Sequence, residues 1–128
     1  MNITEVIQRH PLILAVIMSA TSRTEEESID RVVHEAEAIQ QTMDLLKRFE
    51  PHKRLHPANT YWWKHVVEVN IPKGYISEAA LLVALVESGF RIQRANYPDC
   101  VWVRTNLPKA AEELRLSRWK DVNAKLLK

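Results

Sequence analysis

Eight consecutive apolar residues, Ala79 to Val86, constrain the fold of this chain more than any other feature. A helix that is apolar on every side is typically buried on every side. Ser77 followed by Glu78 favours a helix start just before the run, and Gly89 favours a stop just after it. The segment is therefore predicted to be the central core helix, which leaves charged and aromatic side chains to meet the surroundings.

Three further helices are expected in the first 50 residues. A short helix is predicted over residues 1–9, and the wholly apolar Leu12 to Met18 is predicted to be a buried helix, although periodicity alone also allows a buried strand. Thr24 followed by Glu27 forms a capping box, which predicts a long helix over 25–49. Apolar residues recur along it at alternating steps of three and four, as in a coiled-coil seam: Ile29, Val32, Ala36, Ile39, Met43 and Leu46. This seam suits packing against another helix, and a homodimer built on it is expected.

The second half of the chain reads as helix, turn, helix and hairpin. Two prolines bracket a basic connector over 51–58, where neither helix nor strand is expected and a hinge is predicted. Asn59 or Thr60 is expected to cap a short helix from Tyr61 to Val69. Alternating residues over 90–94 and 100–105 predict a β-hairpin, and Pro108 opens a basic helix over 107–128.

Together these elements predict a single α+β domain over residues 1–128, mainly helical, with four to five helices and one β-hairpin in the C-terminal half. The order of elements over 59–105 is loosely winged-helix-like. In a winged helix the second helix reads the DNA major groove and needs polar side chains toward the bases. Here the second helix is the apolar run, so we expect it to be core and not a reader.

Cysteine usage and run length bear on the compartment. Cys100 is the only cysteine, which excludes an internal disulfide and favours a reducing compartment, the cytoplasm. The apolar run from Leu12 to Met18 has seven residues, whereas a membrane-spanning helix needs about 20. The segment before it carries Glu5 against Arg9 and has no clear positive bias, so a cleaved signal peptide is not expected. No membrane association is predicted.

Charge is divided unevenly along the chain. Residues 1–50 carry 5 Lys or Arg and 9 Asp or Glu, a balance of −4, whereas residues 51–128 carry 13 and 7, a balance of +6. Such a split is typical of a chain with an anionic partner, or of two halves that attract each other. If nucleic acid is the partner, its phosphates are expected to meet basic side chains of the connector, the hairpin and the last helix. These candidates are Lys53, Arg54, Arg91, Arg94, Arg104, Arg115, Arg118 and Lys120.

Catalytic and metal-binding motifs are not recognisable in the sequence, and no cofactor is expected. His52 and His56 are four residues apart, but the flanking prolines argue against the helix that would bring them together. With only two glycines, Gly74 and Gly89, the chain lacks a glycine-rich phosphate loop. His65 and Glu68 lie three apart on a predicted helix, so a small enzyme with His65 as general base stays open as an alternative.

Adjacent tryptophans provide candidates for a protein interface. Trp62 and Trp63 cannot point the same way on one helix, so one is expected to pack inward and the other to lie at the rim or against a partner. Both are candidate partner-binding residues, and a protein-binding module or an inhibitor of a host factor is the second functional alternative.

The stretch from Asn59 to Phe90 carries a Y-x-x-K-H-x-x-E helix, a GYIS turn, a helix of small residues and a GF exit. The matched positions are Tyr61, Lys64, His65, Glu68, Gly74, Tyr75, Ile76, Ser77, Gly89 and Phe90. With these motifs the stretch, about a quarter of the chain, resembles small proteins of bacteriophages and other bacterial mobile elements. After Ser77 the chain has Glu78 and Ala79 where that pattern has an NG pair, so the role of this turn does not carry over. The resemblance implies a bacterial or phage source and implies no activity.

The leading functional prediction is a non-enzymatic accessory or regulatory module that contacts nucleic acid through its basic C-terminal half. It depends on the charge split and on the basic hairpin.

Overall fold

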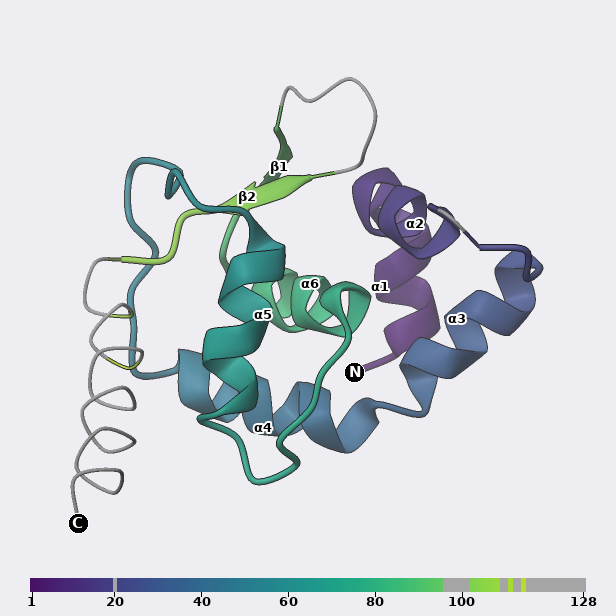
Figure 1. The fold of residues 1–128 in the computed structure, drawn as a ribbon, viewed down its shortest axis with the longest axis horizontal. Helices are drawn as coiled ribbons and strands as arrows, with labels where there is room; N and C mark the ends of the chain where they lie inside the picture. Colours follow the sequence, from purple (N-terminus) through teal and green to yellow (C-terminus); the bar gives the residue numbers. More distant parts are fainter. Residues whose placement is uncertain (20, 96–101, 109–110, 112–113, 115–128) are drawn as a thin grey trace, which may run out of the picture.

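The structure, a computed structural model, describes residues 1–19, 21–95 and 102–108 together with residues 111 and 114. These residues form six helices and a two-stranded sheet (Figure 1). The elements are α1 (Ile3–Arg9), α2 (Pro11–Met18), α3 (Glu25–Val33), α4 (Ala36–Leu46), α5 (Thr60–Glu68), α6 (Glu78–Glu87), β1 (Ile92–Arg94) and β2 (Val103–Thr105). The predicted class, α+β and mainly helical with a hairpin in the C-terminal half, is confirmed.

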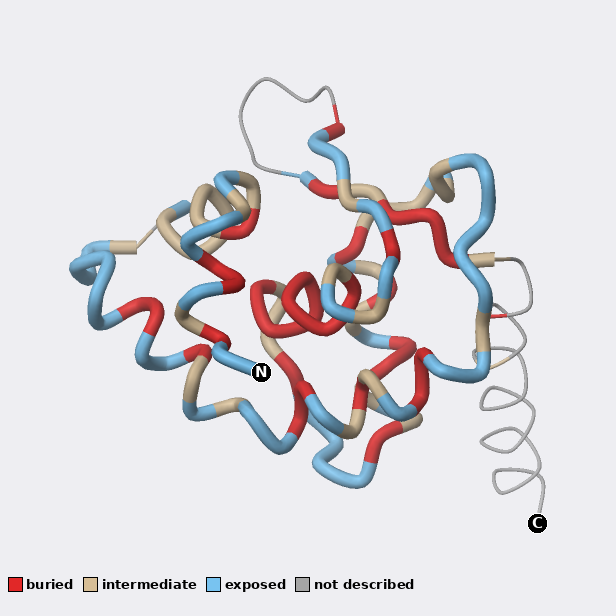
Figure 2. The backbone as a smooth tube through the Cα atoms, turned by 180° about the vertical axis from the view of Figure 1, so that it is seen from behind, coloured by how far each residue is buried: buried red, intermediate tan, exposed pale blue. Residues whose placement is uncertain are grey.

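Helix α6 is the centre of the core, as predicted. Its residues from Ala79 to Leu85 are all buried, and Figure 2 shows them as a continuous red coil enclosed by other elements. The Ser77 hydroxyl caps the helix by accepting the backbone N–H of Ala80 at 3.2 Å. Gly89 ends it with a φ of +87°, a left-handed conformation that glycine adopts without strain. Helices α1, α2, α4 and α5 pack around α6, and the buried residues form one cluster that extends from Ile3 to Ala111.

The long helix predicted over 25–49 is wrong, because the chain turns at His34 and Glu35 and forms α3 and α4 instead. The two helices pack on different partners, α3 on α1 and α2, and α4 on α6. The carboxylate of Glu35, at the turn, accepts hydrogen bonds from the backbone N–H and the hydroxyl of Ser77 at 2.8 and 2.5 Å. The turn between α3 and α4 is therefore held by a contact to Ser77, which is 42 residues away. A heptad pattern within the segment cannot reveal such a contact.

The seam on this segment is used within the chain. Ile29, Val32, Ile39 and Leu46 are all buried in its own core. These side chains therefore cannot form the predicted interface with a second copy, and the homodimer built on this seam is not supported.

Helix α2 is less buried than its sequence predicts. It is a helix, as expected, but only Ile13 is buried, and most of its other apolar side chains are half-buried. Helix α2 contacts α1, α3 and α6, and it lies at the edge of the molecule in Figure 1. Continuous apolar sequence thus led to full burial in α6 and to partial burial in α2.

The predicted hairpin is present. Strands β1 and β2 are antiparallel, with Ile92 opposite Thr105, Gln93 opposite Arg104 and Arg94 opposite Val103. The predicted turn at 96–99 lies outside the described residues. So does most of the predicted last helix, apart from Ala111, which is buried, and Leu114, which packs on the core.

Candidate nucleic-acid interface

The connector over 51–58 lies along the outer side of strand β2. The backbone N–H of His56 donates to the Thr105 carbonyl at 2.7 Å, and that of His52 donates to the Asn106 carbonyl at 2.7 Å. Asn59 then forms an isolated antiparallel bridge with Arg104. The connector contains neither helix nor strand, as predicted, and these bonds fasten it to the hairpin, so the structure gives no support for the predicted hinge.

Asn106 joins three segments at this end of the molecule. Its side chain is buried, donates from Nδ2 to the His52 carbonyl at 2.9 Å and accepts the backbone N–H of Arg91 on Oδ1 at 2.8 Å. A buried amide with both ends bonded is strongly favoured over one left unpaired. Asn106 therefore fixes the connector and the start of β1 against the end of β2. The sequence gives no local signal for this role, because its partners lie 15 and 54 residues away.

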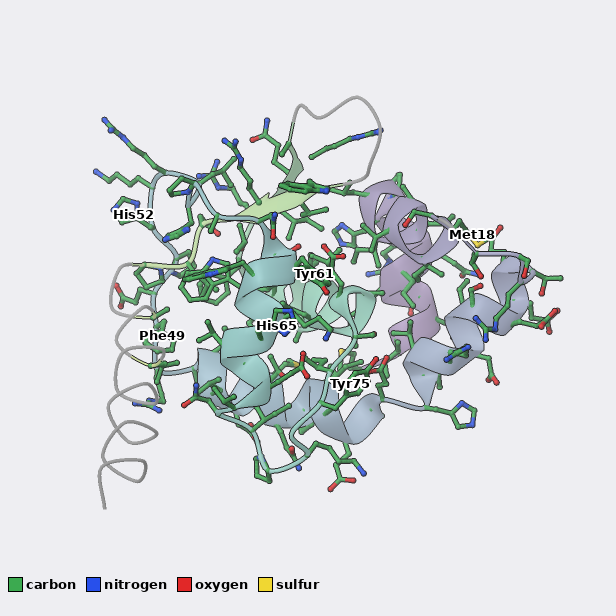
Figure 3. All side chains as sticks on the ribbon, viewed as in Figure 1. Met18, Phe49, His52, Tyr61, His65 and Tyr75 are labelled. Carbon is green, nitrogen blue, oxygen red and sulfur yellow. The ribbon has the colours of Figure 1, made fainter. Side chains whose placement is uncertain are left out.

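Five of the predicted phosphate-binding residues lie on this fastened unit. Lys53 and Arg54 are exposed on the connector, Arg91 and Arg94 are exposed at β1, and Arg104 is half-buried on β2. Figure 3 shows nitrogen-tipped side chains gathered around the connector and the hairpin, near the labelled His52. We refer to these five residues as the basic face; within it, the register of the hairpin places Arg104 on the side of Gln93 and Arg94 on the side of Val103. The other three candidates, Arg115, Arg118 and Lys120, lie outside the described residues.

The basic face lacks nearby compensating charge. Within the described parts of 51–60 and 88–108 there are five Lys or Arg and no Asp or Glu. Asp99, between Arg94 and Arg104 in the sequence, lies outside the described residues, and Glu50 and Glu87 come just before these segments. None of the five cations forms an ion pair with another described residue. Arg91 is held by the main chain instead, with Nη2 donating to the Lys53 carbonyl at 2.6 Å.

A cleft of about 370 Å³ opens within the basic face. Its apolar wall is formed by Leu55, Val86, Phe90 and Ile92. Its polar lining is formed by His10, Arg91 and Gln93. Arg91 thus belongs both to the basic face and to the cleft. Sequence reasoning found the arginine and missed the cleft, because its wall combines residues from four separate parts of the chain.

The two adjacent tryptophans behave differently. Trp63 is 1% exposed and lies in the core, so its predicted role as a partner anchor is wrong. Trp62 is half-buried, and its ring stacks with the His56 ring at 6.0 Å between centroids. The expectation that one tryptophan packs inward while the other lies at the rim is confirmed.

The His65 and Glu68 pair lies on an open part of α5. Nδ1 of His65 is 3.7 Å from Oε1 of Glu68, and the same oxygen accepts from Nζ of Lys64 at 2.5 Å. The His65 side chain is 58% exposed (Figure 3). Lys64 is thus the closer partner of this carboxylate. Neither His65 nor Glu68 lines the basic-face cleft, so the enzyme alternative lacks an enclosed substrate site there.

A second polar cluster lies at the start of α6. Oε1 of Glu78 accepts the hydroxyl of Thr60 at 2.8 Å, while Glu35 holds Ser77. Burial raises the pKa of Glu78, and the Thr60 hydrogen bond and the charge of Lys64 oppose that rise. The cluster ties α5, α6 and the turn before α4 together. These hydrogen bonds are sufficient to explain the cluster as a structural link between the elements.

The described residues include neither a candidate metal site nor a candidate membrane-spanning helix. Among the residues that the structure describes, no group of three or more His, Cys, Asp or Glu could hold a metal ion. Nor is any of the described helices long and apolar enough to cross a bilayer. No protein-family model, curated protein or solved structure matches this chain, so the functional argument depends on the geometry of the basic face.

Proposed function

We propose that this chain is a non-enzymatic accessory or regulatory module of the cytoplasm that binds nucleic acid through the basic face. The observation that carries the proposal is the meeting of five cations from three segments with no carboxylate among the described residues of those segments. Unpaired positive charge concentrated on one folded unit attracts the phosphate backbone, whose counterions are then released.

The fold favours contacts to phosphates over the reading of base edges in a groove. Helix α6 occupies the position of a reading helix after the α5–α6 turn, but it is buried and cannot enter a groove. The basic face instead consists of long side chains on a connector and a hairpin. Four of the five are arginines, whose planar guanidinium groups bind phosphate oxygens in pairs. Binding of this kind depends weakly on sequence and strongly on salt.

Part of the basic face is ordered before any ligand arrives. Arg91 donates one N–H to the Lys53 carbonyl, and its remaining N–H groups can still donate to a phosphate. Asn106 fixes the backbone on both sides of this bond, at His52 and at Arg91. Less conformational entropy is then lost when the ligand binds.

The salt dependence of binding tests the proposal. Five phosphate contacts give a slope of log K against log salt of about −4.5 for duplex DNA and about −3.5 for a single strand. Affinity for a labelled oligonucleotide, followed by fluorescence anisotropy, should therefore fall about 10²- to 10³-fold between 50 and 200 mM salt. Absence of binding at the lower salt, or binding that ignores salt, would contradict the proposal.

A matched pair of double variants places the binding on the molecule. Lys53→Gln with Arg94→Gln removes two exposed cations of the basic face, and we expect the salt slope to become shallower by about two. Arg23→Gln with Arg31→Gln removes two exposed cations near α3 and changes the net charge equally. This control should keep the slope of the unmodified chain. Equal losses in both variants would show that net charge, and not the basic face, drives binding.

A further inference from the structure

The basic-face cleft lies where a bound nucleic acid would cover it. Arg91 lines the cleft and is one of the five cations. Leu55 follows Arg54 directly in the connector, and Gln93 lies directly opposite Arg104 across the hairpin, so their side chains share a face. Arg91 and Arg104 thus place positive charge beside residues that line the cleft.

The lining of the cleft combines an apolar wall with a few polar groups. Leu55, Val86 and Ile92 are half-buried and Phe90 is 4% exposed, so the wall is apolar and largely in place. The imidazole of His10 and the carboxamide of Gln93 supply a donor or an acceptor beside that wall. A nucleobase has the matching chemistry, because its faces are apolar and its edges carry donors and acceptors.

Size limits what the cleft can hold. Its volume of about 370 Å³ is near the lower end of the range of about 300–1,000 Å³ for small-molecule sites. This space is large enough for one base with its sugar. A base within a duplex reaches such a site only after it leaves the stack, at a cost in free energy that a base in a single strand largely avoids.

We propose that the cleft takes one unpaired nucleobase while the basic face holds the flanking phosphates, so that the partner is single-stranded nucleic acid. This inference rests on the proposed function and narrows its ligand. The cleft supplies the apolar surface for the base, and Arg91, at its edge, places charge beside the neighbouring phosphate. The combination of a charged track with a surface for bases is typical of proteins that bind single strands without sequence preference.

Two probes and two cleft variants test the inference by fluorescence anisotropy at one salt concentration. The probes are a labelled 12-nucleotide thymidine oligomer and a labelled 12-base-pair duplex. Val86→Phe adds bulk to the half-buried wall of the cleft, and Gln93→Ala removes an exposed carboxamide with little risk to the fold. Val33→Phe makes the same bulk change at a half-buried position of a different cleft, between α1 and α3, and serves as the control.

We expect the unmodified chain to bind the single strand about tenfold or more tightly than the duplex. Val86→Phe should remove most of this preference and leave duplex affinity unchanged, Gln93→Ala should reduce it a few-fold, and Val33→Phe should leave it intact. Circular dichroism checks the fold of each variant, and Gln93→Ala keeps the test valid if Val86→Phe does not fold.

The outcomes separate the two proposals. Binding of neither probe at low salt would overturn the proposed function itself. Equal affinity for both probes, or equal losses for both in Val86→Phe, would overturn the base-binding cleft and leave phosphate binding by the basic face intact.

Discussion

The charged side chains of the α3–α4 segment and of the basic face differ in whether they have partners of opposite charge. Between Glu25 and Leu46 the chain has seven Asp or Glu and one Arg, yet several of these carboxylates have near partners. Asp30 is 3.6 Å from His34, Asp44 is 3.3 Å from Lys47, and Glu37 is 3.4 Å from Lys73. In the basic face, by contrast, cations from three segments meet without a carboxylate among the described residues around them.

The difference follows from secondary structure. A helix brings residues three and four apart together, so opposite charges at that spacing compensate each other locally. Such exposed pairs add little stability, about 0–1 kcal/mol each. A connector and a hairpin bring together residues that are far apart in sequence, and here the described charged residues they bring together are all positive. Among the described residues no carboxylate of these segments compensates this charge, so an anionic ligand has most to gain here.

Loss of Asn106 should affect the basic face most strongly. In Asn106→Ala the backbone N–H of Arg91 and the carbonyl of His52 lose their side-chain partner. We expect a loss of about 1–3 kcal/mol in the free energy of unfolding, because both hydrogen bonds of a buried side chain are lost. Urea unfolding followed by circular dichroism measures this loss.

Asn70→Ala is the matched control for that change. Asn70 is half-buried and its Nδ2 bonds only the nearby carbonyl of Val66, at 2.7 Å. It should cost less stability than Asn106→Ala and leave nucleic-acid affinity unchanged, whereas Asn106→Ala should weaken binding in a chain that remains folded. An equal effect of the two variants on affinity would mean that Asn106 does not order the basic face.

A cap on the acidic side should show the reverse pattern. Oγ1 of Thr24 accepts the backbone N–H of Glu27 at 3.2 Å, so the N-cap half of the predicted capping box is confirmed, whereas Oε1 of Glu27 accepts the Thr24 hydroxyl at 3.0 Å in place of the Thr24 backbone N–H. Thr24→Ala should cost about 1 kcal/mol and lower the melting temperature by about 4 °C. Oligonucleotide affinity should not change. Reduced affinity at temperatures where the variant is fully folded would break the separation between the two regions.

Glu78, between these regions, should make stability depend on pH. Burial raises its pKa above the ordinary value of 4.5, so the folded chain holds this proton more tightly than the unfolded chain does. Its contribution to stability is therefore most favourable below pH 4.5 and declines as the pH rises through the raised pKa. In Glu78→Gln the amide oxygen can still accept from Thr60, and the decline is removed.

Thermal melts of the two chains between pH 4 and pH 8 measure this effect. The stability of Glu78→Gln relative to the unmodified chain should increase with pH. A difference that stays constant over this range would mean that burial does not perturb this carboxyl.

Local sequence was sufficient for elements whose signals are local. The cap at Ser77, the apolar run and the stop at Gly89 fixed α6, and the same reasoning found α5 and the hairpin. The turn at Glu35 was missed because the heptad pattern continues through it, while its hydrogen bonds reach Ser77. The exposure of α2 was missed because composition says how apolar a helix is and not how many neighbours surround it.

The candidate site was predictable in its charges and not in its geometry. Residue type alone singled out Arg91, Arg94 and Arg104 as phosphate ligands. Neither the tie through Asn106 nor the cleft could be found in this way, because both depend on contacts between residues distant in sequence. Trp63 was misassigned for a related reason, since an adjacent pair on a helix does not reveal which member faces the core.

Under the proposed function, the hydrogen bonds of Asn106 would also link ligand occupancy to the persistence of the fold. Unfolding would separate the five cations along the chain, so a polyanion that contacts all of them would bind the denatured chain much more weakly than the folded one. By mass action, a ligand present at 100 times its dissociation constant adds about 2.7 kcal/mol to the native state. An occupied molecule would thus open less often and resist proteolysis for longer than an empty one, so the supply of nucleic acid would govern its lifetime.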